Sequence, residues 1–183
     1  MELSLSEEQQ SIVDLAAQIL TDKVPPERIR EIESDPSGRW FADDAWNELA
    51  KADLLGIALP ESVGGGGYGF LEACLLLEQQ GRTVAPLPLF ATLVLGALPI
   101  ARFGTNAQQL ALLPAVVDGT SILTAGLFEA GEYVVPELPA TTATRYGDAW
   151  KIDGEKILVP AAHLASRMLV PARTDGGVGV FIV

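Results

Sequence analysis

The first residues with types suited to chemistry form a glycine-rich stretch, residues 64–67, inside the sequence PESVGGGGYG. Glycine-rich loops cradle phosphate groups when a strand precedes them and a Lys-Ser or Lys-Thr pair opens the following helix. No such pair follows Gly67, and no strand-turn-helix pattern surrounds it. The stretch is therefore interpreted as a tight turn into the next helix.

Cys74 and His163 are the only cysteine and the only histidine of the chain. A single cysteine cannot build a disulfide framework or a cysteine-rich metal site, and Cys74 lies among leucines, which indicates a buried thiol. His163 stands beside alanines and a leucine, where a packed or surface histidine is a simpler interpretation than a catalytic one. We expect no metal site.

The most informative stretch is LFEAGEYVVPELPATTATRYGDAWKIDGEK, residues 127–156. Gly147-Asp148 marks a turn, and Asp153-Gly154 stands between strand-forming residues, which is a strong hairpin signal. The first half is a loop in which Tyr133 either stacks on an adenine or flavin edge or lies exposed. Glu129 is expected to have a structural role.

Composition excludes several kinds of partner. The 183 residues include 24 acids and 12 bases, for a formal charge of −12, and no basic run, so no nucleic-acid partner is expected. The N-terminus lacks the positive and apolar regions of a signal peptide, which favours a cytoplasmic location. The uncharged residues 83–100 approach membrane-span length, but Pro86, Pro88 and Pro99 interrupt them, so a short buried helix is favoured over a membrane span.

Hydrophobic periodicity predicts helices in the first part of the chain. Ile12, Leu15 and Ile19 recur at helical spacing behind a Ser6–Gln9 capping-box pattern. Further helices are expected, in chain order, at ERIREIES, at DAWNELAKADLL with Asp43 or Asp44 as its cap, at FLEACLLLEQQG, around residues 91–98 and at NAQQLALLPAVVDG.

Near Gly119 the periodicity changes, and strands are favoured at SILTAGLF, ATTATRY, SRMLVPART and GVGVFIV. The predicted fold class is α+β. An N-terminal all-α helical domain, residues 1–117, precedes antiparallel strands of an incomplete β-barrel-like domain, residues 118–183. The last strand runs into Val183 without a turn or a polar tail, so we expect more chain to follow in the natural product.

Five stretches together resemble the N-terminal half of the acyl-CoA dehydrogenases, and they occur in the order of that family: PESVGGGGYG, LEQQGRTVAPLPL, FGTNAQQLALLPAVVDG, ATTATRYGDAWKIDGEK and ASRMLVPART. The resemblance implies an N-terminal helical domain and part of a middle β-domain. It also implies FAD-dependent removal of hydrogens from Cα and Cβ of an acyl-CoA. The family's C-terminal four-helix bundle, which normally supplies the glutamate base, has no counterpart in these residues, so no catalytic residue is assigned.

In flavin-binding members of the family, a Thr-Glu-Pro-Gly-x-Gly-Ser-Asp loop and a later Lys-x-Trp-Ile-Thr/Ser stretch contact the cofactor. This sequence keeps the spacing from Glu129 through Gly147-Asp148 to Lys156 but not the residue types. The resemblance implies cofactor-binding positions, mostly substituted, at Leu127, Phe128, Glu129, Val134, Leu158, Val159 and Pro160.

The substitutions remove polar groups from these positions. Phe128 stands for a threonine, Val134 for the serine and Pro160 for the hydroxyl residue. Each buried polar atom of a flavin that loses its partner costs about 1–3 kcal/mol. Loss of the flavin site is therefore favoured over a drifted loop that keeps its ligand through other contacts.

The resemblance predicts an acyl-CoA dehydrogenase family subunit for the FAD-dependent α,β-dehydrogenation of an acyl-CoA thioester. We expect it to be the partner with the degenerate flavin loop in a heteromeric complex, with FAD at the interface with a homologous subunit. Some family members form such α2β2 assemblies, including those for steroid side-chain β-oxidation in actinobacteria. Two alternatives stay open: a conventional homotetrameric acyl-CoA dehydrogenase that binds FAD itself, and a non-enzymatic binding or scaffold chain.

Overall fold

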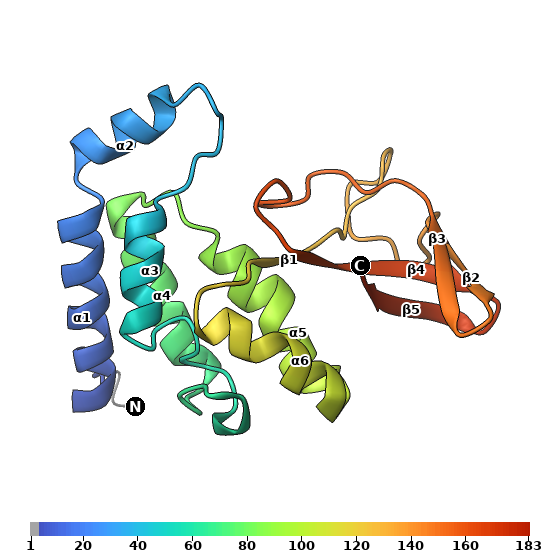
Figure 1. Ribbon diagram of the computed structural model, residues 1–183, viewed down its shortest axis with the longest axis horizontal. Coiled ribbons are helices and arrows are strands. Elements are labelled where there is room, and N and C mark those ends of the chain that lie inside the picture. The colour runs from blue at the N-terminus through green and yellow to red at the C-terminus, as the bar shows by residue number, and fades with distance from the viewer. Residues whose placement is uncertain (1–3) are drawn as a thin grey trace.

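The computed structural model describes residues 4–183, in which a group of helices is followed by a five-stranded sheet (Figure 1). Residues 1–3, which begin the acidic N-terminal stretch, lie outside the described residues. The predicted order of helices before strands is confirmed. In chain order the helical elements are α1 (Glu7–Lys23), α2 (Pro26–Ser34), α3 (Asp43–Lys51), the short η1 (Glu61–Val63), α4 (Phe70–Thr83), η2 (Phe90–Ala97), α5 (Leu98–Phe103) and α6 (Asn106–Val117).

The start of α1 has the predicted capping box. The Gln9 amide N–H donates to Ser6 Oγ at 3.1 Å, and the Ser6 amide N–H donates to Gln9 Oε1 at 3.0 Å. Gln9 also donates from Nε2 to Glu72 Oε1 at 2.8 Å, which joins the start of α1 to α4. The same few residues therefore begin one helix and attach it to another.

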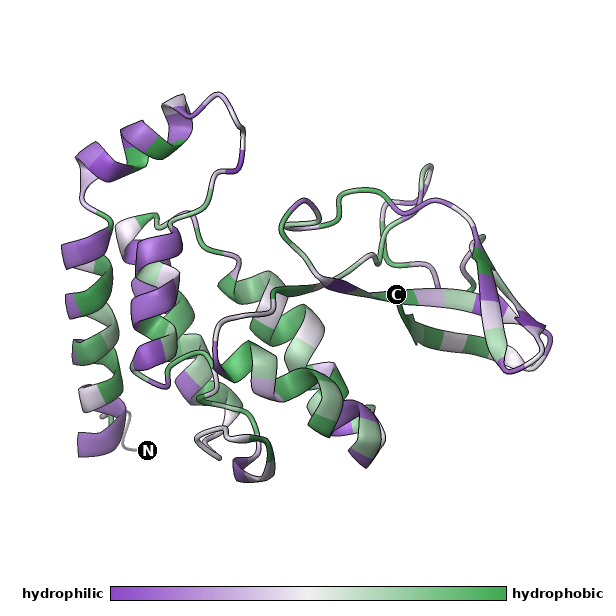
Figure 2. Ribbon diagram, viewed as in Figure 1, coloured by the Kyte–Doolittle hydropathy of each residue, from purple (hydrophilic) through white to green (hydrophobic). Residues whose placement is uncertain are grey.

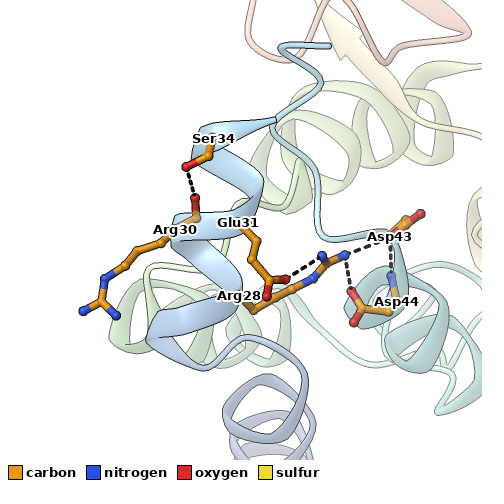
Figure 3. Close-up of polar contacts among 6 residues, drawn as sticks. All are labelled: Arg28, Arg30, Glu31, Ser34, Asp43 and Asp44. Carbon is orange, nitrogen blue, oxygen red and sulfur yellow. Dashed lines mark hydrogen bonds and ion pairs between the residues drawn. The ribbon is translucent and has the colours of Figure 1, made fainter. Parts of the chain in front are cut away.

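The prediction that Asp43 or Asp44 caps α3 is wrong, because Ala42 is the N-cap residue and Asp43 is the first residue of the helix. Both carboxylates instead face Arg28 of α2, whose Nη2 lies 3.6 Å from Asp43 and 3.7 Å from Asp44, while Nη1 lies 3.3 Å from Glu31 (Figure 3). Acids in the first turn of a helix also interact favourably with its dipole. Arg28 thus attaches the mostly hydrophilic α2 to the rest of the helices (Figure 2).

The uncharged stretch forms a longer helical segment than predicted. Residues of η2 adopt a π-helix that continues directly into α5, and Pro99 stands in the first turn of α5 rather than ending the helix. Gly96 lies so close to Leu123 that an added Cβ would collide with it, so η2 packs directly on the first strand. Within the described residues, no helix is both long and apolar enough to cross a membrane.

The sheet contains β1 (Leu123–Ala125), β2 (Thr142–Tyr146), β3 (Ala149–Asp153), β4 (Arg167–Thr174) and β5 (Gly177–Ile182). Its order is β1-β4-β2-β3, with β5 paired to β4. The α+β class is confirmed, but the expectation of antiparallel strands holds only for β2–β3 and β4–β5, because β4 pairs in parallel with both β1 and β2. Two-residue turns impose antiparallel neighbours, whereas the long segment 126–141 brings β2 back in the same direction as β1, and β4 then pairs in parallel with both.

The hairpin predicted at Asp153-Gly154 is also wrong. The turn lies at Gly147-Asp148, where Gly147 has φ +62°, and β3 ends at Asp153. Gly154 instead allows a close backbone approach, since an added Cβ would lie 2.6 Å from Thr141 Oγ1. Between β3 and β4, the chain makes a single isolated bridge, from Ile157 to Phe128.

A continuous apolar core joins the helices to the beginning of the sheet. Its largest fully buried members include Leu20, Leu49, Leu76 and Leu123. Trp46, 2% exposed, donates from Nε1 to the carbonyl oxygen of Gly119 at 2.8 Å. This bond holds the chain where α6 ends, immediately before β1 and the loop that follows it.

Candidate functional site

The centre of the candidate site is Glu129, which follows β1 and is only 5% exposed. Three donors come from the two residues before β2: the amide N–H of Ala140 at 2.6 Å, and the amide N–H and hydroxyl of Thr141 at 3.0 and 2.6 Å. The fourth donor is the ammonium group of Lys156 at 2.7 Å. The side chains of Glu129 and Lys156 are each 6% exposed, so the ion pair is buried and fully surrounded by protein.

This environment keeps the Glu129 carboxyl ionised. Burial by itself raises its pKa, but the hydrogen bonds from Lys156 and Thr141 act in the opposite direction, and the amide of Ala140 adds to them. Together the donors outweigh burial and lower the pKa of Glu129 from 4.5 to about 2. A carboxylate with four donors, one of which is the buried ammonium group of Lys156, is satisfied within the protein, which supports the expected structural role.

Glu129 also closes a loop. We call residues 130–139 the 130–139 loop. Near its start the Glu132 amide binds the Glu129 carbonyl, and just after its end the Ala140 amide binds the Glu129 carboxylate. The loop leaves Glu129 through a tight turn in which the Glu132 amide donates to the Glu129 carbonyl at 3.2 Å and Gly131 has φ +86°. A glycine is needed at this turn position because a side chain disfavours positive φ. Loops whose ends lie close together are frequently functional.

A second loop, residues 157–166, lies beside the first. The Ile157 amide donates to the Phe128 carbonyl at 2.9 Å, and Thr124 Oγ1 donates to the Pro160 carbonyl at 2.6 Å. His163 Nε2 lies 3.0 Å from the carbonyl oxygen of Arg39, in the connection between α2 and α3. His163 therefore has a surface role in attaching this loop to the helices.

Two residues of this second loop adopt strained backbone conformations. Leu158 has φ +51° and Ala161 has φ +52°, and neither is a glycine. Residues in this left-handed region cost of order 1–3 kcal/mol and persist where surrounding contacts hold them. The bonds to Phe128, Thr124 and Arg39 supply such contacts.

The structure brings together most, but not all, of the positions that the resemblance implies for FAD. The bridge between Phe128 and Ile157 and the Glu129–Lys156 pair place residues 127–129 beside residues 156–160. Val134 instead lies on the exposed part of the 130–139 loop, 68% exposed. Burial varies along the set: Glu129 is buried, Leu127, Phe128 and Val159 are partly buried, and Val134, Leu158 and Pro160 are exposed.

The side chains at these positions do not fit an FAD held by this surface alone. Val134, Leu158 and Pro160 offer no side-chain donor to a flavin ring or a pyrophosphate. Lys156, the nearby cation, is already paired with Glu129. Of the three acids in residues 127–140, Glu129 is paired with Lys156, but Glu132 and Glu137 are exposed and would repel a pyrophosphate.

Lys156 and Thr141 complete the cluster around Glu129, and neither was predicted as a site residue. The retained spacing between Glu129 and Lys156 was the available signal, but it did not show that the two side chains meet. Cys74 is partly buried rather than buried as expected. Across the described residues, no group of three or more His, Cys, Asp or Glu is arranged to hold a metal ion.

A cleft with a volume of about 520 Å³ lies elsewhere, among the helices. Phe70, Leu98, Arg102 and Phe103 are among its lining residues. It shares no residue with the two loops, so it is separate from the site around Glu129.

Comparison with known proteins assigns the family. Residues 6–120 match the family described as acyl-CoA dehydrogenase, N-terminal domain. Acyl-CoA dehydrogenase FadE27 of Mycobacterium tuberculosis is 34% identical over 100% of this chain and 47% of its own length. The chain belongs to the acyl-CoA dehydrogenase family, and it spans about half the length of the relatives it matches.

Two solved structures are similar over almost the whole chain. The Tcur3481-Tcur3483 steroid ACAD G363A variant has 46% sequence identity and a TM-score of 0.89, and the match covers 98% of this chain and 48% of that one. The ChsE4-ChsE5 complex from Mycobacterium tuberculosis has 32% identity and a TM-score of 0.90, with 100% and 48% covered. Relatives of this chain thus form heteromeric complexes. Other members of the family bind flavin, as in a glutaryl-CoA dehydrogenase in complex with FADH2.

Proposed function

We propose that this chain is a subunit of a heteromeric acyl-CoA dehydrogenase that carries out FAD-dependent α,β-dehydrogenation of an acyl-CoA thioester, and that it is the partner with the degenerate flavin loop. FAD would then lie at an interface with a homologous subunit, which also supplies the catalytic base. The same proposal includes a cytoplasmic location and a division into a helical domain, residues 1–117, and part of a β-domain, residues 118–183.

One observation carries this proposal: the frame of the site is intact while its ligand-facing side chains are not suited to FAD. Glu129, Thr141 and Lys156 hold the two loops together through short bonds. The exposed positions on the two loops carry Val134, Leu158 and Pro160, and none of these residues has a side-chain donor. A chain that had lost all function would be expected to lose the buried polar cluster as well, because such clusters are costly unless complete.

The two solved relatives support a partner and a substrate class. One is described as a steroid ACAD with two named chains, and the other as a complex of two proteins. By analogy, we propose that the acyl group is attached to a bulky, steroid-like body. In such a complex this chain's residues would orient the shared site and exclude water, since none of the residues at the FAD positions is suited to move a proton.

The test is to measure bound flavin by visible absorption and by quantifying released FAD. The chain is purified alone and after co-expression with each chain of the Tcur3481-Tcur3483 pair. Flavin that appears only with a partner would support a shared-site subunit. Flavin in the chain alone would overturn the proposal in favour of a conventional enzyme that binds FAD itself. A complex that contains no flavin would overturn the proposal in favour of a non-enzymatic scaffold chain.

A further inference from the structure

The 130–139 loop exposes an unusual number of large apolar side chains. Tyr133 is 100% exposed, Val134 68%, Val135 45% and Leu138 62%. Single exposed apolar residues are ordinary on protein surfaces, but contiguous groups of them mark interaction sites. These four exposed residues lie within six consecutive positions of one loop, and we call them the loop patch.

The loop patch is presented by a loop whose ends are fixed. The Glu129 carboxylate holds the amides of Ala140 and Thr141 at 2.6 and 3.0 Å, and Pro139 beside them is buried. Pro136 restricts the backbone within the patch itself. Fixed ends and a proline reduce the conformational entropy that the loop loses on binding, which favours a docking role over that of a freely moving connection.

Charge identifies the chemistry of the partner. The charged side chains of the loop, Glu132 and Glu137, are both acidic and exposed, and the chain as a whole has a formal charge of −12. A second copy of this chain would bring acids against acids, and an anionic lipid surface would be repelled in the same way. An apolar pocket with a basic rim, on a different protein, complements both features of the loop.

We propose that the 130–139 loop is a preformed docking element that inserts Tyr133, Val134 and Leu138 into an apolar pocket with a basic rim on the homologous subunit. This inference rests on the proposed heteromeric function and names the surface that makes the contact. The loop thus uses positions that resemble a cofactor loop to recognise a protein. Glu129 is the positioning residue of this element, because it closes the loop and takes no part in the contact.

The test measures the affinity of the full chain for each chain of the Tcur3481-Tcur3483 pair, made separately, by surface plasmon resonance. The double variant Tyr133→Asp/Val134→Asp places two charges in the proposed contact. We expect its Kd to rise at least about 30-fold, as for the central residues of protein interfaces. The matched control is Tyr146→Asp, which changes an 82% exposed tyrosine at the far end of β2 and should alter Kd less than about 2-fold.

A second variant tests the basic rim. Glu132→Lys/Glu137→Lys leaves the loop patch in place but reverses its charge. We expect slower association, about 10-fold at low salt, and a weaker dependence of the rate on salt concentration. All variants change exposed side chains, so their urea midpoints should equal that of the original chain, which separates loss of docking from loss of folding.

The outcomes separate this inference from the proposed function. If the original chain binds neither probe, both fail. If it binds and the Tyr133→Asp/Val134→Asp variant binds equally well, the docking inference alone is overturned. Self-association of this chain that the same variant abolishes would identify a second copy as the occupant, and vesicle binding that it abolishes would identify a lipid surface. Either result would also overturn the inference.

Discussion

Replacing Glu129 with glutamine should destabilise the protein strongly at neutral pH. Glutamine keeps the shape of the side chain but removes its charge, so the ammonium group of Lys156 stays buried at 6% exposure without a counter-ion. It also weakens the bonds from Thr141 and Ala140, which are charge-assisted in the original protein.

Two routes to the magnitude agree. Removing one partner of a buried ion pair costs about 3–5 kcal/mol. The pKa of Glu129 is lowered from 4.5 to about 2, and each pKa unit corresponds to about 1.4 kcal/mol, so the ionised form contributes up to about 3 kcal/mol to stability. We therefore expect Glu129→Gln to lower the free energy of unfolding by about 3 kcal/mol at pH 7.

The sign of the pH dependence follows from the same shift. Because the folded protein lowers the pKa, the stabilisation is complete above about pH 4.5 and is lost as the pH falls towards 2. Glutamine imitates the protonated carboxyl. As the pH falls from about 4.5 towards 2, the stability of the original protein should therefore approach that of Glu129→Gln. Urea unfolding followed by circular dichroism, at steps from pH 7 to pH 3, measures this convergence.

A matched double variant isolates the ion pair. Glu129→Gln/Lys156→Met removes both charges, and we expect it to recover part of the lost stability, since no buried charge is then unpaired. The reasoning is refuted if Glu129→Gln costs less than about 1 kcal/mol at pH 7. It is also refuted if the difference in free energy of unfolding between Glu129→Gln and the original protein is the same at pH 5 and at pH 3.

Three further predictions concern stability and are measured by urea unfolding at pH 7. Val84 lies at the end of α4, is 73% exposed and has φ +51°. Val84→Asn should therefore raise the free energy of unfolding by about 1 kcal/mol, whereas a decrease would show that the backbone of Val84 is not strained. Gly154→Ala should cost about 1–3 kcal/mol, because the new Cβ would lie 2.6 Å from Thr141 Oγ1, and unchanged stability would contradict this close approach. Trp46→Phe should cost about 1–3 kcal/mol by leaving the Gly119 carbonyl without its 2.8 Å donor, and a neutral effect would mean that water replaces the indole.

Local patterns in the sequence were sufficient for the helices and for one turn. The capping box of Ser6 and Gln9, the apolar spacing of α1 and the Gly147-Asp148 turn all depend on residues within a few positions of one another. Such patterns can be recognised without the tertiary structure, because the hydrogen bonds and side-chain spacing that define them lie within a single turn of the chain. The substituted positions at Val134, Leu158 and Pro160 were implied by the resemblance to the family's flavin motif.

Packing between distant segments decided the rest. Asp43 and Asp44 looked like caps but face Arg28, and Asp153-Gly154 looked like a hairpin but makes room for Thr141. The parallel pairing of β4 with β1 and β2 depends on where long connections return, which no local pattern records.

The site shows this division most clearly. The sequence by itself placed Glu129 in a loop, and the family resemblance implied that its spacing to Lys156 is retained. Only the tertiary structure decided that Glu129 is buried, paired with Lys156 27 positions away, and bound to the residues that close the 130–139 loop. The physical reason is that desolvation and ion pairing depend on which surfaces meet, and that is settled when the sheet and its loops pack together.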